Sequence, residues 1–304
     1  MYEKRMIVPL VGSDIKVDEK YDLGNGFLIK KKEFSIKTKL RTFEKEGYQY
    51  ISPFKINEAN ASNTWLVAYY KDKNINKSEI DNNFEDKIHT IITLFHIVKV
   101  TPLYPTVIIL DFKEDSSWMS TSIRNMTSKF YLPEDQNNHD FTINLEDIED
   151  VKTMFTNIVE FISEDNISEN RVLRSIAFYK LAVETYYIAL RFLNYTIALE
   201  CIFTTSDREI KKQLSERVAW FLADSNSERE KIMGKVRKIY KIRSEIAHGG
   251  TLKQSNLIKL DKLILLLEGY LRSVYLKILT DDKLFDIFMD TKKIDNYFKR
   301  IMFA

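Results

Sequence analysis

Short apolar runs separated by turn residues mark the first 135 residues of the chain. The runs are rich in β-branched and aromatic residues, which predicts strands at Arg5 to Val11, Gly26 to Lys37, Trp65 to Tyr70 and Thr106 to Phe112. Apolar positions from Ile80 to Val98 instead recur every three or four residues, so one amphipathic helix interrupts the strands. These patterns predict a mostly β or α+β module.

From about residue 144 onward the apolar positions keep helical spacing almost without interruption. No proline follows Pro133, and the polar stretch Glu134 to Asp140 separates the two patterns. The predicted fold class is therefore α+β, with an N-terminal mostly β or α+β domain at residues 1–140 and a C-terminal all-α bundle at residues 141–304. Helices are expected at about 145–162, 171–183, 186–203, 255–279 and 281–302, and two more begin at the capping-box patterns Ser206 to Glu209 and Ser227 to Glu230.

The stretch from Lys238 to Gly250 is a predicted helix end that gathers several chemically active side chains. Gly249 and Gly250 follow the last apolar position, and glycine readily takes the left-handed conformation that ends a helix. His248 is therefore expected in the final turn, where the helix dipole favours a protonated imidazole.

Spacing decides which of these side chains can act together. At about 100° per residue, Arg243 and His248 lie about 140° apart around the helix and flank a shared edge. Ser244 and Glu245 precede His248 by four and three residues, so both can reach the imidazole. An arginine that clamps a phosphate, beside a histidine that titrates near neutrality, suits phosphodiester chemistry. The alternative is that these cations only complement the helix dipole.

Glu200 lies in an apolar stretch of a predicted central helix, where an unpaired carboxylate would be costly. It is expected to hold Arg243 or Arg217, or else to form a structural ion pair elsewhere in the bundle. Tyr240 precedes Arg243 by three residues, so its hydroxyl can border the site or its ring can pack in the core. Ser244 is expected to position other groups, because nothing marks it as an activated nucleophile.

Composition narrows the protein class without naming a function. The chain has 304 residues, with 44% hydrophobic and 30% charged residues, as in a soluble globular protein of about two domains. No apolar run approaches the ~20 residues of a membrane span, and the N-terminus shows no signal-peptide pattern. The single Cys201 is expected to be a core residue, and its isolation fits a reducing cytoplasm.

The net charge is only +2, but its distribution along the chain is uneven. Residues 134–169 hold eleven acids and one lysine, whereas residues 207–243 hold eleven basic residues and six acids. A basic helix face leading to Arg243 would attract a polyanion, although an ordinary solvated surface gives the same count. The candidates for contact with RNA are Arg217, Arg237, Lys238 and Lys241.

The residues of this helix end and its neighbours resemble a known family. The string Arg243 to His248 looks like the Arg-polar-x(n)-His signature of HEPN domains, the helical nucleases of prokaryotic defence, toxin and RNA-processing systems. With Ala198 to Phe203, Glu216 to Trp220 and Ile239 to Ser244, the run is similar to the Apea-like HEPN branch, which is associated with phage defence. The resemblance covers roughly residues 170–280.

The resemblance implies metal-independent RNA cleavage, in which the 2′-hydroxyl of the RNA attacks the adjacent phosphate and leaves a 2′,3′-cyclic phosphate. Carried onto this chain, Arg243 would stabilise the charge on the phosphorane and His248 would transfer or orient the proton. The remaining candidates Ser244, Glu245, Tyr240 and Glu200 would support them. No metal and no cofactor is implied.

The resemblance also implies partners. A homodimer through the helical domain would place two motifs in one cleft, and transfer RNA is a reasonable substrate because abortive-infection nucleases often disable translation. The N-terminal domain would be a sensor or regulator, and a phage-derived trigger, a nucleic acid and intramolecular inhibition stay open for it. No membrane partner is expected, because no apolar run is long enough to span one. The alternative is a non-catalytic HEPN module that binds RNA, a nucleotide or a protein partner.

Overall fold

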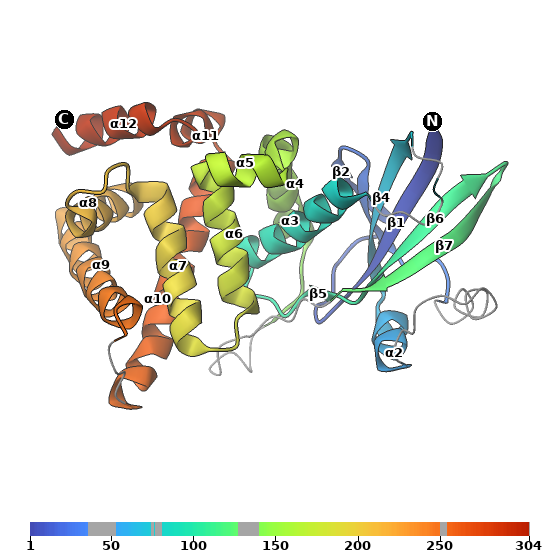
Figure 1. Ribbon diagram of the computed structural model, residues 1–304, viewed down its shortest axis with the longest axis horizontal. Helices are drawn as coiled ribbons and strands as arrows, with labels where there is room; N and C mark the ends of the chain where they lie inside the picture. Colours follow the sequence, from blue (N-terminus) through green and yellow to red (C-terminus); the bar gives the residue numbers. More distant parts are fainter. Residues whose placement is uncertain (36–52, 74–75, 77–80, 127–139, 250–253, 304) are drawn as a thin grey trace. The chain divides into compact units, whose positions relative to one another are not determined.

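The computed structural model describes residues 1–35, 53–73, 76, 81–126, 140–249 and 254–303 (Figure 1). These residues form two compact units, one that ends at Val159 and one that begins at Glu160. The first unit contains an antiparallel sheet and the second is helical, which confirms the predicted α+β class.

The first unit is built on a seven-stranded sheet in the order β2-β3-β4-β1-β6-β7, with β5 also paired to β1. Every pairing between these strands is antiparallel. A turn at Gly24-Asn25-Gly26, all three with positive φ, joins β2 to β3. The strands are β1 (Tyr2–Val11), β2 (Lys20–Gly24), β3 (Phe27–Lys31), β4 (Thr64–Asp72), β5 (Tyr104–Pro105), β6 (Val107–Glu114) and β7 (Ser117–Asn125).

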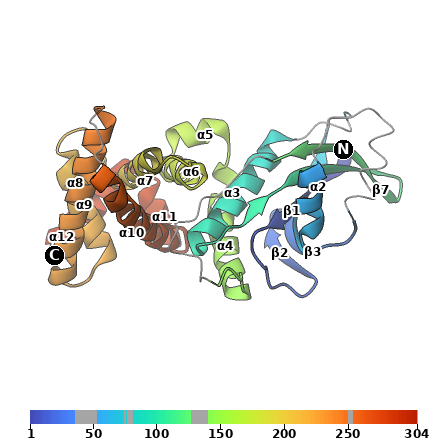
Figure 2. The same cartoon turned by 90° about the horizontal axis from the view of Figure 1, so that it is seen from below.

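Successive residues of a strand point to opposite faces of the sheet. Because the buried residues of β1, β4 and β6 are nearly consecutive, both faces of the sheet carry buried side chains. Helix α2 (Pro53–Ala61) covers one face, where Ala59 packs with Trp65 and other buried residues. Helix α3 (Asn82–Val98) covers the other, and its Phe84 stacks on Phe27 and Tyr70. Figure 2 shows α2 and α3 separated by the strands.

Helix α4 (Leu145–Ile158) belongs to the first unit, so the chain divides after Val159 and not after residue 140. Its Phe155 contacts Phe27 edge to face at 5.2 Å, and Lys99 at the end of α3 lies 3.8 Å from Asp147. The apolar side of α4 is therefore buried against the sheet unit. The rest of the predicted boundary loop, residues 134–139, lies outside the described residues.

The second unit contains the predicted helices that follow α4, with corrected ends (Figure 1). Ser225, and not Ser227, caps α9, because its side chain accepts from the Glu228 backbone N–H. The predicted last helix is two helices, which are separated at Met289 and Asp290. The helices are η2 (Val159–Phe161), α5 (Glu164–Glu169), α6 (Arg171–Glu184), α7 (Ile188–Phe203), α8 (Ile210–Leu222), α9 (Asn226–Ala247), α10 (Gln254–Leu279), α11 (Asp282–Phe288) and α12 (Thr291–Phe303).

Helices α8 and α9 form a hairpin with only Ala223, Asp224 and Ser225 between them. This short connection makes the helices antiparallel, so the first turn of α8 lies beside the last turns of α9. Among the described residues, no helix is long and apolar enough to cross a membrane.

Candidate active site at the end of α9

The candidate motif lies at the C-terminal end of α9, as predicted. Ala247 is the last helical residue, and Gly249 has a φ of +76°, the left-handed conformation expected of a glycine after a helix. His248 is the C-cap, one position beyond the last turn, and its backbone N–H donates to the Ser244 carbonyl at 3.1 Å. Its side chain is exposed at the helix end.

Glu200 on α7 holds Arg243, which is one of the two partners that the sequence left open. Arg243 Nη2 donates to Glu200 Oε2 at 3.2 Å, and Arg243 Nε lies 3.1 Å from Glu200 Oε1. The two side chains are 27% and 15% exposed, so solvent screens this pair little. A guanidinium has five N–H donors, and the contacts with Glu200 involve only the Nε and Nη2 groups of Arg243.

The ion pair fixes Arg243 more than it stabilises the bundle. Burial raises the pKa of the Glu200 carboxyl, and the attraction and hydrogen bond of Arg243 offset only part of that rise. The ionised carboxylate therefore remains at a cost, and a buried pair of this kind is weak support for stability. Its clear effect is to hold the guanidinium in one place.

We expect Glu200→Gln to lower the free energy of unfolding by about 1–3 kcal/mol at neutral pH, because Arg243 keeps an oxygen that can accept its hydrogen bond but loses its charged partner. A carboxyl with a raised pKa in the folded state binds its proton more tightly there. Its contribution to stability is present below the unfolded pKa and is lost as pH rises through the folded pKa. Urea denaturation should show the advantage of wild type over Glu200→Gln growing from neutral pH towards about pH 4. If the stability advantage of wild type instead shrinks as the pH falls, the attraction of Arg243 lowers the pKa of Glu200 more than burial raises it.

Tyr240 connects Arg243 to an open pocket beside the helix end. The Arg243 guanidinium carbon lies 6.0 Å from the centroid of the Tyr240 ring, within the range of a cation–π contact. The pocket has a volume of about 450 Å³. It is lined by Lys211, Tyr240, Lys241, Ser244, Glu245 and His248.

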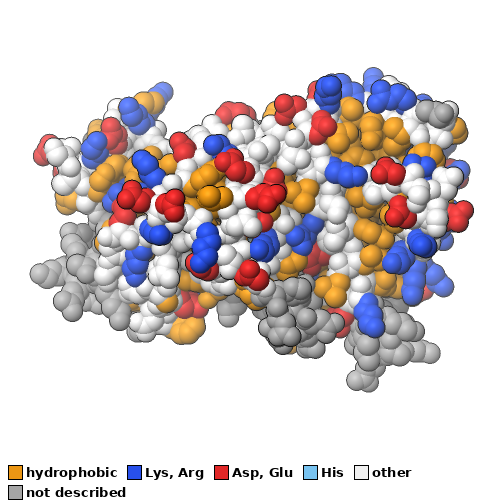
Figure 3. Space-filling view, turned by 180° about the vertical axis from the view of Figure 1, so that it is seen from behind, with side chains coloured by type: hydrophobic (Ala, Val, Ile, Leu, Met, Phe, Trp, Pro, Cys, Tyr) orange, Lys and Arg blue, Asp and Glu red, His pale blue; other side chains and the backbone are white. Residues whose placement is uncertain are grey.

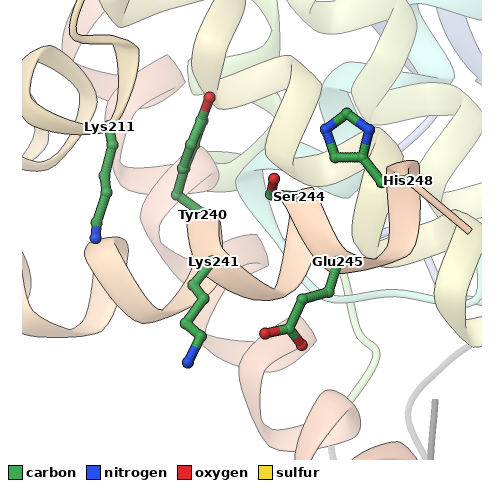
Figure 4. A pocket seen from close by; sticks show the side chains of 6 residues that line it. All are labelled: Lys211, Tyr240, Lys241, Ser244, Glu245 and His248. Carbon is green, nitrogen blue, oxygen red and sulfur yellow. The ribbon is translucent and has the colours of Figure 1, made fainter. Parts of the chain in front are cut away.

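The lining residues of α9 form two rows. Tyr240, Ser244 and His248, spaced by four residues, project from one side of the helix, whereas Lys241 and Glu245 project from the other (Figure 4). Arg243 is not among the lining residues, which agrees with the angular separation expected between Arg243 and His248. One chain therefore brings five of the predicted site residues to the pocket and holds Arg243 beside it.

Three of the four predicted RNA-contacting residues are exposed on α9, namely Arg237, Lys238 and Lys241. Only Lys241 lines the pocket. Lys and Arg side chains gather at the edge of the helical unit in the space-filling view (lower right of Figure 3). Lys211 on α8 also lines the pocket and was not singled out from the sequence. The signal for it is the short α8–α9 connection, which places residue 211 opposite residue 240.

Arg217 does not join this group, because its side chain is committed inside the second unit. Its Nη1 donates to the Phe203 carbonyl and the Thr205 hydroxyl, both at 3.0 Å, and its Nη2 pairs with Asp295 at 2.6 Å. The guanidinium also lies 5.2 Å from the Phe298 ring centroid. Arg217 thus ties α8 to the end of α7 and to α12.

Arg217→Ala is expected to lower the free energy of unfolding by roughly 2–4 kcal/mol, because it leaves buried or half-buried acceptors without their charged donor. Lys212→Ala on the same helix removes an exposed cation and should change stability by about 0.5 kcal/mol or less. Urea denaturation of both variants measures the difference. If Arg217→Ala is as stable as wild type but binds RNA more weakly, Arg217 contacts RNA and does not stabilise the bundle.

The described part of the chain contains no group of three or more His, Cys, Asp or Glu side chains that could hold a metal ion. His96 on α3 is packed, with Nε2 2.8 Å from the Leu103 carbonyl, and Cys201 on α7 is a half-buried free thiol. Burial raises the pKa of this thiol, which disfavours the reactive thiolate.

We compared the chain with models of known protein families, with curated proteins and with solved structures, and none of them matches.

Proposed function

We propose that this protein is a metal-independent endoribonuclease of the HEPN type, with Arg243 and His248 as its catalytic residues. The observation that carries the proposal is the pairing of Arg243 with Glu200 at a helix end where His248 lines a pocket. An arginine that only complemented the helix dipole would need no acidic partner on another helix. Here Glu200 holds a charged side chain in place before any substrate binds, as transition-state stabilisation requires, on the helix whose end carries His248.

The proposed reaction uses the RNA itself as the nucleophile. The 2′-oxygen bonds to the adjacent phosphorus, the bond from phosphorus to the 5′-oxygen breaks, and the products carry a 2′,3′-cyclic phosphate and a 5′-hydroxyl. Arg243 donates to the phosphate oxygens on which negative charge grows. His248 takes the proton of the 2′-hydroxyl or supplies one to the leaving 5′-oxygen.

A homodimer through the helical unit would complete this arrangement. Arg243 and His248 of one chain lie on different sides of α9, so a second copy would enclose a phosphate between the two helix ends. The measured mass of the purified protein in solution checks this part of the proposal. A monomer that cleaves RNA would contradict the shared site.

The proposed setting is cytoplasmic antiviral defence by abortive infection, with transfer RNA as the substrate. The sheet unit would receive a phage-derived trigger. These assignments follow from the resemblance of residues 170–280 alone.

Incubation of the purified protein with total RNA in EDTA tests the proposal. Wild type should produce fragments that end in 2′,3′-cyclic phosphate, and Arg243→Ala and His248→Ala should not. If wild type cleaves no RNA, alone or with phage-infected cell extract, and does not slow the growth of cells that express it, the nuclease proposal fails. Cleavage by Arg243→Ala and by His248→Ala at the wild-type rate would contradict it as well.

One observation favours the second candidate, a non-catalytic module that binds RNA, a nucleotide or a protein partner. Arg243 does not line the pocket that His248 lines. RNA binding without cleavage by wild type in the same experiment would support this candidate.

A further inference from the structure

The pocket at the end of the α8–α9 hairpin combines an aromatic ring with side chains of both charges. Its volume of about 450 Å³ lies within the roughly 300–1,000 Å³ of small-molecule sites. Two lysines, one from each helix, outweigh the single carboxylate of Glu245. A ligand that suits this lining has a flat face and a negative charge.

We infer that this pocket holds one unpaired nucleotide of the RNA, with its base against the Tyr240 ring and its backbone phosphate at Lys211. The inference rests on the proposed function, because it takes RNA as the ligand. It adds two roles that the catalytic proposal does not require. Tyr240 selects single-stranded over double-stranded RNA, and Lys211 sets the position of the strand.

Tyr240 is placed to serve as the platform for the base. It is half-buried, its neighbour Arg243 lies 6.0 Å from the ring centroid, and Ser244 and His248 follow it in the same row. His248 lies two turns further along this row, about 12 Å along the helix axis, so a base on the Tyr240 ring would leave the ribose of a neighbouring nucleotide nearer the imidazole. Bases in an RNA double helix are stacked on one another and cannot reach such a ring, so the substrate must be single-stranded there.

Lys211 is placed to bind the backbone. It is exposed in the first turn of α8 and lies across from Tyr240 and Lys241 (Figure 4). An ammonium group on a long flexible side chain binds phosphate as a point charge. Lys212, the next residue, is equally exposed, but it pairs with Glu209 at 3.9 Å and does not line the pocket. The two lysines form a matched pair for an experiment.

The test uses the full-length protein and two uncleavable ligands of equal length. One is a fluorescent oligodeoxyuridine, which lacks the 2′-hydroxyl, and the other is the same backbone without bases. Fluorescence anisotropy gives the dissociation constant at several salt concentrations. Because neither ligand can be cleaved by 2′-hydroxyl attack, the result does not depend on catalysis.

Wild type should bind the oligodeoxyuridine about tenfold or more tightly than the abasic strand, and Tyr240→Leu should bind both equally. Lys211→Ala should weaken binding of both ligands and reduce the slope of log K against log salt by about 0.7, the value for one phosphate contact on a single strand. Lys212→Ala should leave the slope unchanged.

Three results would overturn the inference. Tyr240→Leu could keep the preference for bases, Lys211→Ala and Lys212→Ala could behave alike, or wild type could bind the oligodeoxyuridine as tightly when it is annealed to its complementary strand as when it is single-stranded. RNA cleavage by wild type is measured separately. Cleavage without this binding pattern would reject the pocket but keep the nuclease, whereas the binding pattern without cleavage would keep the pocket and reject the nuclease.

Discussion

Arg243→Ala is expected to slow RNA cleavage by about 100- to 1,000-fold, the usual effect of removing one preorganised donor to a transition-state anion. The guanidinium is held by Glu200 before any substrate arrives, so little reorganisation is needed when charge grows on the phosphate. Single-turnover rates on one defined RNA measure the change in the chemical step.

Two further variants make this result specific to Arg243. Arg243→Lys keeps the charge but loses the planar pair of donors, so most of the rate loss should remain. Arg300→Ala removes an exposed cation from α12 and should cleave like wild type. If Arg243→Ala unfolds at the same urea concentration as wild type and cleaves at the wild-type rate, Arg243 has no role in catalysis.

His248→Ala is expected to slow cleavage by about 100- to 10,000-fold, the range for loss of a general acid or base. His248 lines the pocket from an exposed C-cap position, so the substitution leaves the core of the second unit intact. Stability should therefore change little while the rate falls. The same single-turnover assay, with urea denaturation of the variant, separates these two quantities.

His89→Ala provides the matched control, because His89 is a half-buried histidine of α3 in the first unit. It should cleave at the wild-type rate. Equal losses in His89→Ala and His248→Ala would point to a general effect of histidine replacement on the preparation, and not to chemistry at the end of α9.

Elements with a long apolar run or a clear helical spacing could be predicted from the sequence, and elements with few or scattered apolar residues could not. β1, β4 and β6 bury nearly continuous apolar runs, and α3 keeps helical spacing. β7 was missed because a sheet-edge strand needs few apolar residues, and only its Ile123 is buried. Helix α2 was missed because its short sequence begins at Pro53 and mixes polar and apolar residues without a clear apolar side.

The domain boundary was misplaced because periodicity shows that a helix has an apolar side but not which unit covers it. The apolar side of α4 includes Val151 and Phe155, and these residues are buried in the first unit. The acidic residues of α4 are then an outer face of the sheet unit. A sequence pattern alone is equally compatible with either neighbour.

The site could be predicted only where it depends on local structure. The positions of Arg243, Ser244, Glu245 and His248 follow from one helix and its glycine stop, so local rules were sufficient. The choice of Arg243 over Arg217 as the partner of Glu200 depends on how three helices pack. The place of Lys211 depends on the α8–α9 hairpin, whose short connection is the signal that relates residue 211 to residue 240.

The central claim is that the RNA supplies its own nucleophile to a site formed by Arg243 and His248. Its most direct measurement compares wild-type cleavage of an RNA in EDTA with cleavage of the same RNA carrying a single 2′-deoxynucleotide at the scissile position. We predict that cleavage at that position stops and that the unmodified RNA yields a 2′,3′-cyclic phosphate. Undiminished cleavage of the deoxy-substituted RNA, or a product that ends in a 3′-hydroxyl, would contradict the claim.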